Sequence, residues 1–154
     1  MRCYILSILT FLLVTSINYS QELDETKKNI ISSIENHQGE IIKISDQIWE
    51  LAELAFNEYE SSKILSDYAE ENGFIVEKGV AGMPTAFVAS YGSGKPVISV
   101  LGEFDALPGL SQQTTPNKNP LIEGGSGHGC GHNMFGAASL ASAIAIKEQI
   151  ESGD

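Results

Sequence analysis

Two histidines and one cysteine are crowded into the glycine-rich stretch GSGHGCGHNMFGAA, residues 125–138. Cys130 and His132 are separated by one glycine and precede a predicted helix, so a thiolate and an imidazole can converge on one point. These donors suit a transition metal of the zinc or manganese type. The alternative is a buried thiol beside an ordinary histidine. His128 is either a third ligand or a residue that supports a ligand or faces the substrate.

The second candidate for chemistry is a pair of acids, Glu103 and Asp105, at the end of the segment PVISVLGEFD. If this segment is a strand, the two carboxylates point to the same side of it. The carboxyl end of a central strand is where open α/β sheets bind ligands. The alternative is that the strand has ended and both acids are solvated.

The elements that must position these residues follow from local patterns. Residues 96–105 are continuously apolar in their first half, which predicts a buried central strand. Residues 106–127 are rich in Pro, Gly, Asn and Thr, which predicts a long functional loop. An alanine-rich helix is expected to begin near Met134 or Phe135 and to end at Gly153.

Helices are predicted before these elements, and short strands between them. Apolar residues recur every three or four positions from about 22 to 58, and Gly39 is expected to divide this region into two helices. Ser61 or Ser62 should cap a third helix that stops at Asn72, and residues 74–79 and 85–92 read as strands. His37 is expected at the surface. This order indicates an α/β or α+β fold with a buried sheet.

Composition narrows the class of partner. The chain has 154 residues, of which 42% are hydrophobic, and a formal charge of -11, which suits one globular domain or a piece of a larger one. Such an acidic molecule repels phosphate backbones and anionic membranes, so a nucleic acid is not an expected partner.

The first twenty residues have the pattern of a signal peptide: a basic start, a short apolar run and small polar residues. Cleavage is expected after Ser16 or Ser20, which predicts a secreted or periplasmic protein without a stable membrane anchor. Cys3 would leave with the signal, and Cys130 would then be the only thiol, so no internal disulfide is expected. Pairing with another chain, burial and metal ligation remain its three alternatives.

The motifs GEFDALPGLSQ and GHGCGHN, followed by the alanine-rich helix, resemble the M20 metallopeptidase family in its amidohydrolase branch. The resemblance runs from about Ile30 to the end, and it is strongest toward the hydrolases of aminobenzoyl-glutamate. It implies an α/β catalytic domain of the phosphorylase/hydrolase-like type, with two divalent ions, Mn²⁺ or Zn²⁺, and an inserted dimerisation domain. Residues 21–154 would then be the N-terminal, incomplete part of the catalytic domain, without the dimerisation domain.

The resemblance also implies roles for single residues. Cys130 and His132 match the metal ligands of the family's Cys-Gly-His motif. Asp105 matches an aspartate that supports the metal site without binding the ion. Glu103 stands where the wider family has a metal-binding histidine, so it is a candidate ligand or support. Asn133, another such candidate, departs from the aspartate of the auxin-conjugate hydrolases and agrees with the aminobenzoyl-glutamate branch.

The activity implied is metal-dependent hydrolysis of an amide between an aromatic or acyl group and an amino acid. The expected substrate is p-aminobenzoyl-glutamate, a folate breakdown product, which is cleaved to p-aminobenzoate and glutamate. The resemblance places the general-base glutamate and the remaining ligands beyond Asp154, so we expect this chain alone to be inactive. In the longer protein, a homo-oligomer or a hetero-oligomer with a related subunit is expected. The alternatives are another N-acyl amino acid amidohydrolase or dipeptidase of the family, and a non-catalytic metal-binding chain.

Overall fold

The fold begins with one long helix, α2 (Glu25–Leu51), in a computed structural model that describes residues 24–153. The predicted signal peptide lies outside the described residues. The Asp24 side chain caps α2 by accepting a hydrogen bond from the Lys27 backbone N–H at 2.9 Å. The predicted division at Gly39 is wrong, because the helix continues through this exposed residue. A single glycine costs a helix only about 1 kcal/mol, and burial of residues on both sides of it outweighs that cost.

The N-terminus of the next helix, α3 (Tyr59–Glu71), is capped by a residue that precedes the helix and not by a serine. The predicted caps, Ser61 and Ser62, lie inside the helix and are buried. The Glu53 carboxylate accepts hydrogen bonds from the backbone N–H groups of Glu60 at 3.1 Å and Ser61 at 2.8 Å. A carboxylate at this end satisfies free N–H groups and complements the helix dipole. The sequence pattern missed it because the acid lies several residues before the helix.

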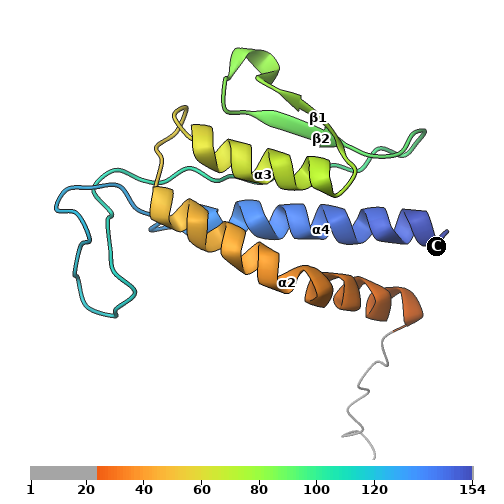
Figure 1. Cartoon of the computed structure of the whole chain (residues 1–154), viewed down its shortest axis with the longest axis horizontal. Helices are drawn as coiled ribbons and strands as arrows, with labels where there is room; N and C mark the ends of the chain where they lie inside the picture. Colours follow the sequence, from red (N-terminus) through yellow and green to blue (C-terminus); the bar gives the residue numbers. More distant parts are fainter. Residues whose placement is uncertain (1–23, 154) are drawn as a thin grey trace, which may run out of the picture.

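A two-stranded antiparallel sheet follows α3, which ends before Asn72 as predicted. Strand β1 (Ile75–Lys78) pairs with β2 (Phe87–Ser90), and a short 3-10 helix, η1 (Val80–Gly82), lies between them. Both predicted short strands are thereby confirmed, and α3 packs beside them (Figure 1).

The predicted central strand at residues 96–105 is wrong. No hydrogen bond between backbone groups joins residues 96–101 to another described residue, and this segment has no regular secondary structure. Val97, Ile98 and Leu101 are 79%, 74% and 75% exposed. A strand needs a hydrogen-bonded neighbour, and β1 and β2 pair only with each other. The apolar side chains of this segment are therefore not covered by other residues of the described part, 24–153.

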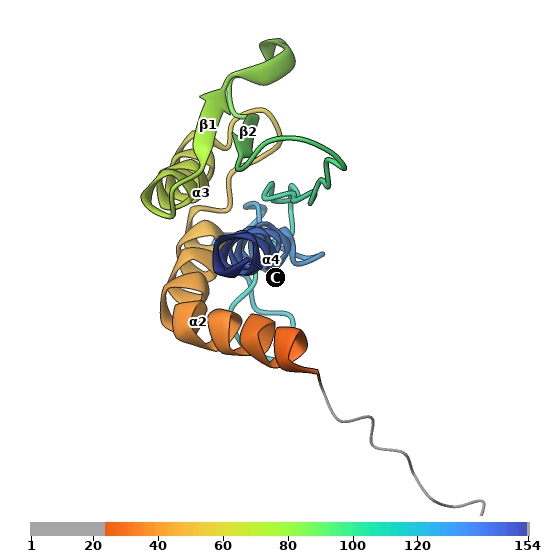
Figure 2. The same cartoon turned by 90° about the vertical axis from the view of Figure 1, so that its right-hand side faces the viewer.

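Helix α4 (His132–Ser152) packs against both α2 and α3, and the view along it shows both neighbours (Figures 1 and 2). It begins slightly earlier than predicted, after Gly131 in a left-handed conformation (φ 82°), and ends at Gly153 as predicted. The buried apolar cluster joins these three helices through Ile44, Ile48, Leu65, Ala69, Ala137, Leu140 and Ile144. The core thus holds the first turn of α4 in a defined position.

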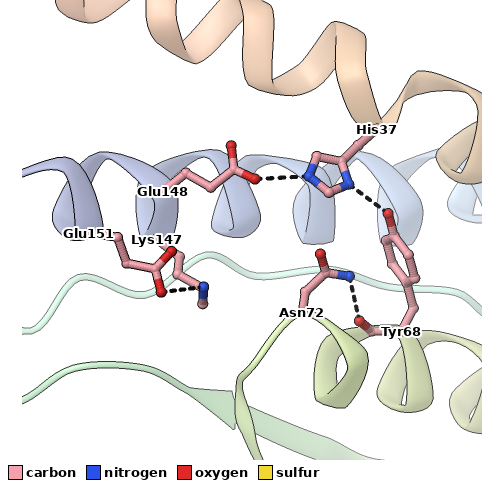
Figure 3. A network of polar contacts seen from close by, with 6 residues as sticks. All are labelled: His37, Tyr68, Asn72, Lys147, Glu148 and Glu151. Carbon is pink, nitrogen blue, oxygen red and sulfur yellow. Dashed lines mark hydrogen bonds and ion pairs between the residues drawn. The ribbon is translucent and has the colours of Figure 1, made fainter.

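A polar network also joins the three helices (Figure 3). His37 on α2 contacts the Tyr68 hydroxyl on α3 through Nδ1 at 2.8 Å. Its Nε2 contacts the Glu148 carboxylate on α4 at 2.9 Å. The His37 side chain is 23% exposed, so this histidine is partly buried between the helices, whereas the sequence predicted a surface position. Because His37 lies far from any motif, its position in the sequence could not reveal a contact between helices.

The described chain is thus a mixture of helices and a small sheet, which is compatible with part of an α/β domain. Among residues 24–153, no helix is both long enough and apolar enough to cross a membrane.

Candidate metal centre

Glu103, Asp105 and His132 converge at the start of α4. Each offers one ligand atom, and these atoms all lie within 4.8 Å of one another. His132 Nδ1 lies 2.7 Å from an Asp105 carboxylate oxygen, and Nε2 lies 2.9 Å from a Glu103 oxygen. The two acids thus contact one imidazole, one at each ring nitrogen, although they do not extend from a strand.

Close contact between α4 and residues 102–104 brings the triad together. A Cβ at Gly136 on α4 would lie 3.0 Å from the Glu103 carbonyl oxygen, and one at Gly102 would lie 3.1 Å from the Ser139 Cβ. The Ser139 hydroxyl donates a hydrogen bond of 2.7 Å to the Leu101 carbonyl. Small residues on this face of α4 therefore let the acid-bearing segment lie directly against the helix.

The two carboxylates lie on opposite sides of the imidazole, and each can accept a hydrogen from the ring nitrogen that it contacts. With the hydrogen of His132 on Nδ1 and Asp105 as its acceptor, the Nε2 lone pair would be available to a metal. Glu103 lies on the Nε2 side, where its oxygen and that nitrogen form a pair of donors. Zinc ligands of this type lie about 2.0–2.2 Å from the ion, so two of them are at most about 4.4 Å apart. The 2.9 Å between Glu103 and Nε2 lies within that limit, and it is equally the length of a hydrogen bond.

Cys130 is an exposed free thiol. Its sulfur does not belong to the group of mutually close ligand atoms found among the described residues. The predicted ligand pair of Cys130 and His132 therefore stays a prediction, with only His132 inside the triad. The motif did not decide whether Glu103 binds the ion or supports a ligand. In the structure its carboxylate contacts the His132 imidazole at Nε2.

His128 and Asn133 face α2 rather than the triad. His128 Nε2 donates a hydrogen bond of 3.0 Å to the Ile48 carbonyl, and Asn133 donates to the Ser45 carbonyl at 3.3 Å and hydroxyl at 3.1 Å. Burial lowers the pKa of His128 below its ordinary value, which favours the neutral ring. Its Nδ1 is buried without a hydrogen-bond partner among residues 24–153. These two side chains anchor the glycine-rich turn to α2.

The glycines of the turn permit a close approach to the preceding loop. A Cβ at Gly127 would lie 2.2 Å from the Leu110 carbonyl oxygen, and one at Gly129 would lie 2.5 Å from the Leu110 side chain. Gly127 also forms two backbone hydrogen bonds of 3.0 Å with Leu107. The group that these glycines approach is thus the loop itself.

A cavity of about 330 Å³ lies beside the turn. Its wall combines the end of α2 with the predicted functional loop, and it includes Trp49, Glu50, Leu110, Leu121, Ile122 and His128. Sequence reasoning missed Trp49 and Glu50, because they continue a helical pattern and carry no motif. The only signal available was that Trp49 is the single tryptophan of the chain.

Comparison with known proteins supports the resemblance drawn from the motifs. No model of a protein family matches the chain. The chain is 44% identical over 130 residues to one subunit of the p-aminobenzoyl-glutamate hydrolase of Escherichia coli, covering 84% of this chain and 27% of that protein. It is 34% identical over 127 residues to thermostable carboxypeptidase 1 of Saccharolobus solfataricus, covering 81% and 31% of the two chains. Hippurate hydrolase of Campylobacter jejuni is 29% identical over 121 residues, covering 79% and 31%.

These relatives are hydrolases and peptidases of the M20 type. The chain spans between 27% and 31% of the length of the three. The resemblance predicted from the two motifs is confirmed: the chain is similar in sequence to part of the M20-type hydrolases.

Proposed function

We propose that the chain belongs to a longer M20-type enzyme that hydrolyses an amide between an aromatic or acyl group and an amino acid. The observation that carries this proposal is the triad of Glu103, Asp105 and His132, in which the two carboxylates contact opposite nitrogens of one imidazole. The sequence similarity supports the reaction class, because the relatives are named as hydrolases of p-aminobenzoyl-glutamate and of hippurate and as a carboxypeptidase.

The triad supplies the protein's part of a hydrolytic metal centre. Asp105 contacts His132 Nδ1 and would hold the ring in place for a metal at Nε2. Nε2 and the Glu103 carboxylate are the donors that would hold a divalent ion, with Cys130 as the further ligand that the motif predicts. A bound Zn²⁺ or Mn²⁺ supplies Lewis-acid polarisation of the scissile carbonyl and a water of lowered pKa. We expect two such ions and a general-base glutamate in the longer protein.

For the substrate, p-aminobenzoyl-glutamate is our first choice. The E. coli relative carries this compound in its name and is 44% identical. That relative is also named as one subunit of its enzyme, so we propose a hetero-oligomer, or a homo-oligomer, for the longer protein. The signal peptide pattern adds a proposed secreted or periplasmic location.

The experiment is a hydrolysis assay on the longer protein, with release of p-aminobenzoate as the readout. A chelator should abolish the release, and Zn²⁺ or Mn²⁺ should restore it. His132→Ala should remove activity, whereas Glu123→Gln, a change at an exposed loop acid, should leave it unchanged. Turnover that survives both the chelator and His132→Ala would refute the proposal.

An alkylation assay separates metal ligation by Cys130 from a role in pairing with another chain. In a Cys3→Ser background Cys130 is the only thiol, because the chain contains two cysteines. Metal ligation predicts that Zn²⁺ protects Cys130 from iodoacetamide and that His132→Ala weakens this protection. A role in pairing with another chain predicts a reducible dimer without metal dependence.

A further inference from the structure

The cavity at the end of α2 is built from two parts of the chain with different properties. Trp49 and Glu50 come from the last turn of α2, and Leu110, Leu121 and Ile122 come from the loop, which lies beside that end of the helix (Figure 1). Its volume of about 330 Å³ lies at the lower end of the range of ligand pockets, roughly 300–1,000 Å³. It therefore suits one small group rather than a whole peptide.

Hydrogen bonds within the loop keep this wall in shape. The Gln112 side chain donates to the Asn117 carbonyl at 2.7 Å and accepts from the Asn119 backbone N–H at 3.0 Å. The Ser111 hydroxyl accepts from the Ile122 backbone N–H at 3.0 Å. Most of the loop's polar groups beside the cavity are thus engaged in holding the loop, and the cavity is largely formed before a ligand binds.

Glu50 differs from these groups, because its side chain is exposed and takes part in none of the hydrogen bonds that hold the loop. No lysine or arginine among the described residues lines the cavity. A carboxylate ligand would therefore meet a like charge and no compensating cation, which is unfavourable. An aromatic group that carries a hydrogen-bond donor fits better, since Trp49 offers an aromatic surface and Glu50 an acceptor.

The cavity adjoins the candidate metal centre through the glycine-rich turn. Residues 125–129 line the cavity and lead directly to Cys130 and His132. The two backbone hydrogen bonds between Gly127 and Leu107 tie this wall to the segment that carries Asp105. A group bound in the cavity would thus lie on the same turn that carries the candidate ligands.

We propose that this cavity binds the aromatic half of the amide substrate, with its ring against Trp49 and a ring amine donating to Glu50. This inference rests on the proposed hydrolysis of an aryl or acyl amide and specifies the orientation of that substrate. The amino acid half, with its carboxylates, lies outside this cavity.

The test is binding of p-aminobenzamide, which carries the aminobenzoyl group and no carboxylate, to the ¹⁵N-labelled chain. The single tryptophan gives one indole N–H resonance, which reports on Trp49 alone. Saturable movement of this resonance is expected with p-aminobenzamide and none with L-glutamate. Glu50→Gln should weaken p-aminobenzamide binding by roughly three- to tenfold and leave benzamide binding unchanged, because the amide oxygen of glutamine still accepts but lacks the charge that strengthens the hydrogen bond.

Glu35→Gln is the matched control, because Glu35 is another exposed acid on α2 and does not line the cavity. An unmoved indole resonance, equal movement with L-glutamate, or equal weakening by Glu35→Gln would overturn the inference. In the longer enzyme, Glu50→Gln should raise KM for p-aminobenzoyl-glutamate without lowering kcat. The binding measurements need no metal, so they fail independently of the metal centre. If only the proposed binding in the cavity is wrong, chelator-sensitive hydrolysis remains. If only the proposed metal centre is wrong, the shift of the indole resonance remains.

Discussion

Replacing Asp105 with asparagine tests how the candidate metal centre is held. In the structure Asp105 contacts His132 Nδ1 at 2.7 Å, and the two side chains are 25% and 23% exposed. An asparagine has nearly the same shape but no charge. It therefore orients the imidazole less firmly, and its amide can donate to Nδ1 and thereby favour the tautomer whose Nε2 carries the hydrogen.

Loss of a carboxylate that supports a metal-binding histidine typically costs about 10–100-fold in affinity. Because Asp105 is partly exposed, solvent screens its charge and we expect the lower end, about tenfold or 1.4 kcal/mol. Glu103→Gln should cost more than Asp105→Asn if Glu103 binds the ion directly. The reverse order would indicate that Glu103 only supports the site.

The assay is competition for Zn²⁺ between the chain and a chromogenic chelator at constant pH and ionic strength. Asp46→Asn, at an exposed position on α2, is the matched control and should leave the affinity unchanged. An Asp105→Asn variant that retains the full Zn²⁺ affinity of the unmodified chain, with circular dichroism unchanged, would refute the assigned role of Asp105. An unmodified chain that loses Zn²⁺ to the chelator as readily as His132→Ala would refute the metal centre itself.

Three further predictions concern stability. Gly39→Ala should raise the free energy of unfolding in urea by about 1 kcal/mol, because Gly39 is exposed within α2 and nothing lies within 4 Å of an added Cβ; a decrease would contradict the continuous helix. Gly127→Ala adds the same methyl group but should lower stability by roughly 1–3 kcal/mol, because the Cβ would lie 2.2 Å from the Leu110 carbonyl oxygen; an unchanged urea midpoint would show that the loop does not lie there. The hydrogen bond from Lys63 is the main cause that holds the pKa of Asp67 below its ordinary value of 3.8. The stability that this ion pair contributes is therefore complete above that value and is lost as the pH falls through the lower pKa of the folded state. Asp67→Asn should thus reduce the loss of stability on acidification in this range. An acid-unfolding profile identical to that of the unmodified chain would count against the ion pair.

Much of the fold followed from local patterns. The apolar periodicity predicted helices, and the start and end signals placed the end of α3 at Asn72 and the end of α4 at Gly153. The strands β1 and β2 were predicted because they are short and adjacent in sequence. The division at Gly39 was wrong because propensity is a weak signal beside burial against α4.

In the candidate site, the amino-acid sequence alone established which residues are available: two acids separated by one residue, a cysteine and histidine on either side of a glycine, and a helix directly after them. The contact of Asp105 and Glu103 with opposite nitrogens of His132 came only from the packed molecule, because it depends on α4 lying against residues 102–104. The same holds for residues 96–101, which stay unpaired, since a strand depends on a partner elsewhere in the molecule. The spacing of residues along a chain determines what chemistry they can offer, whereas contacts between distant segments determine which atoms meet.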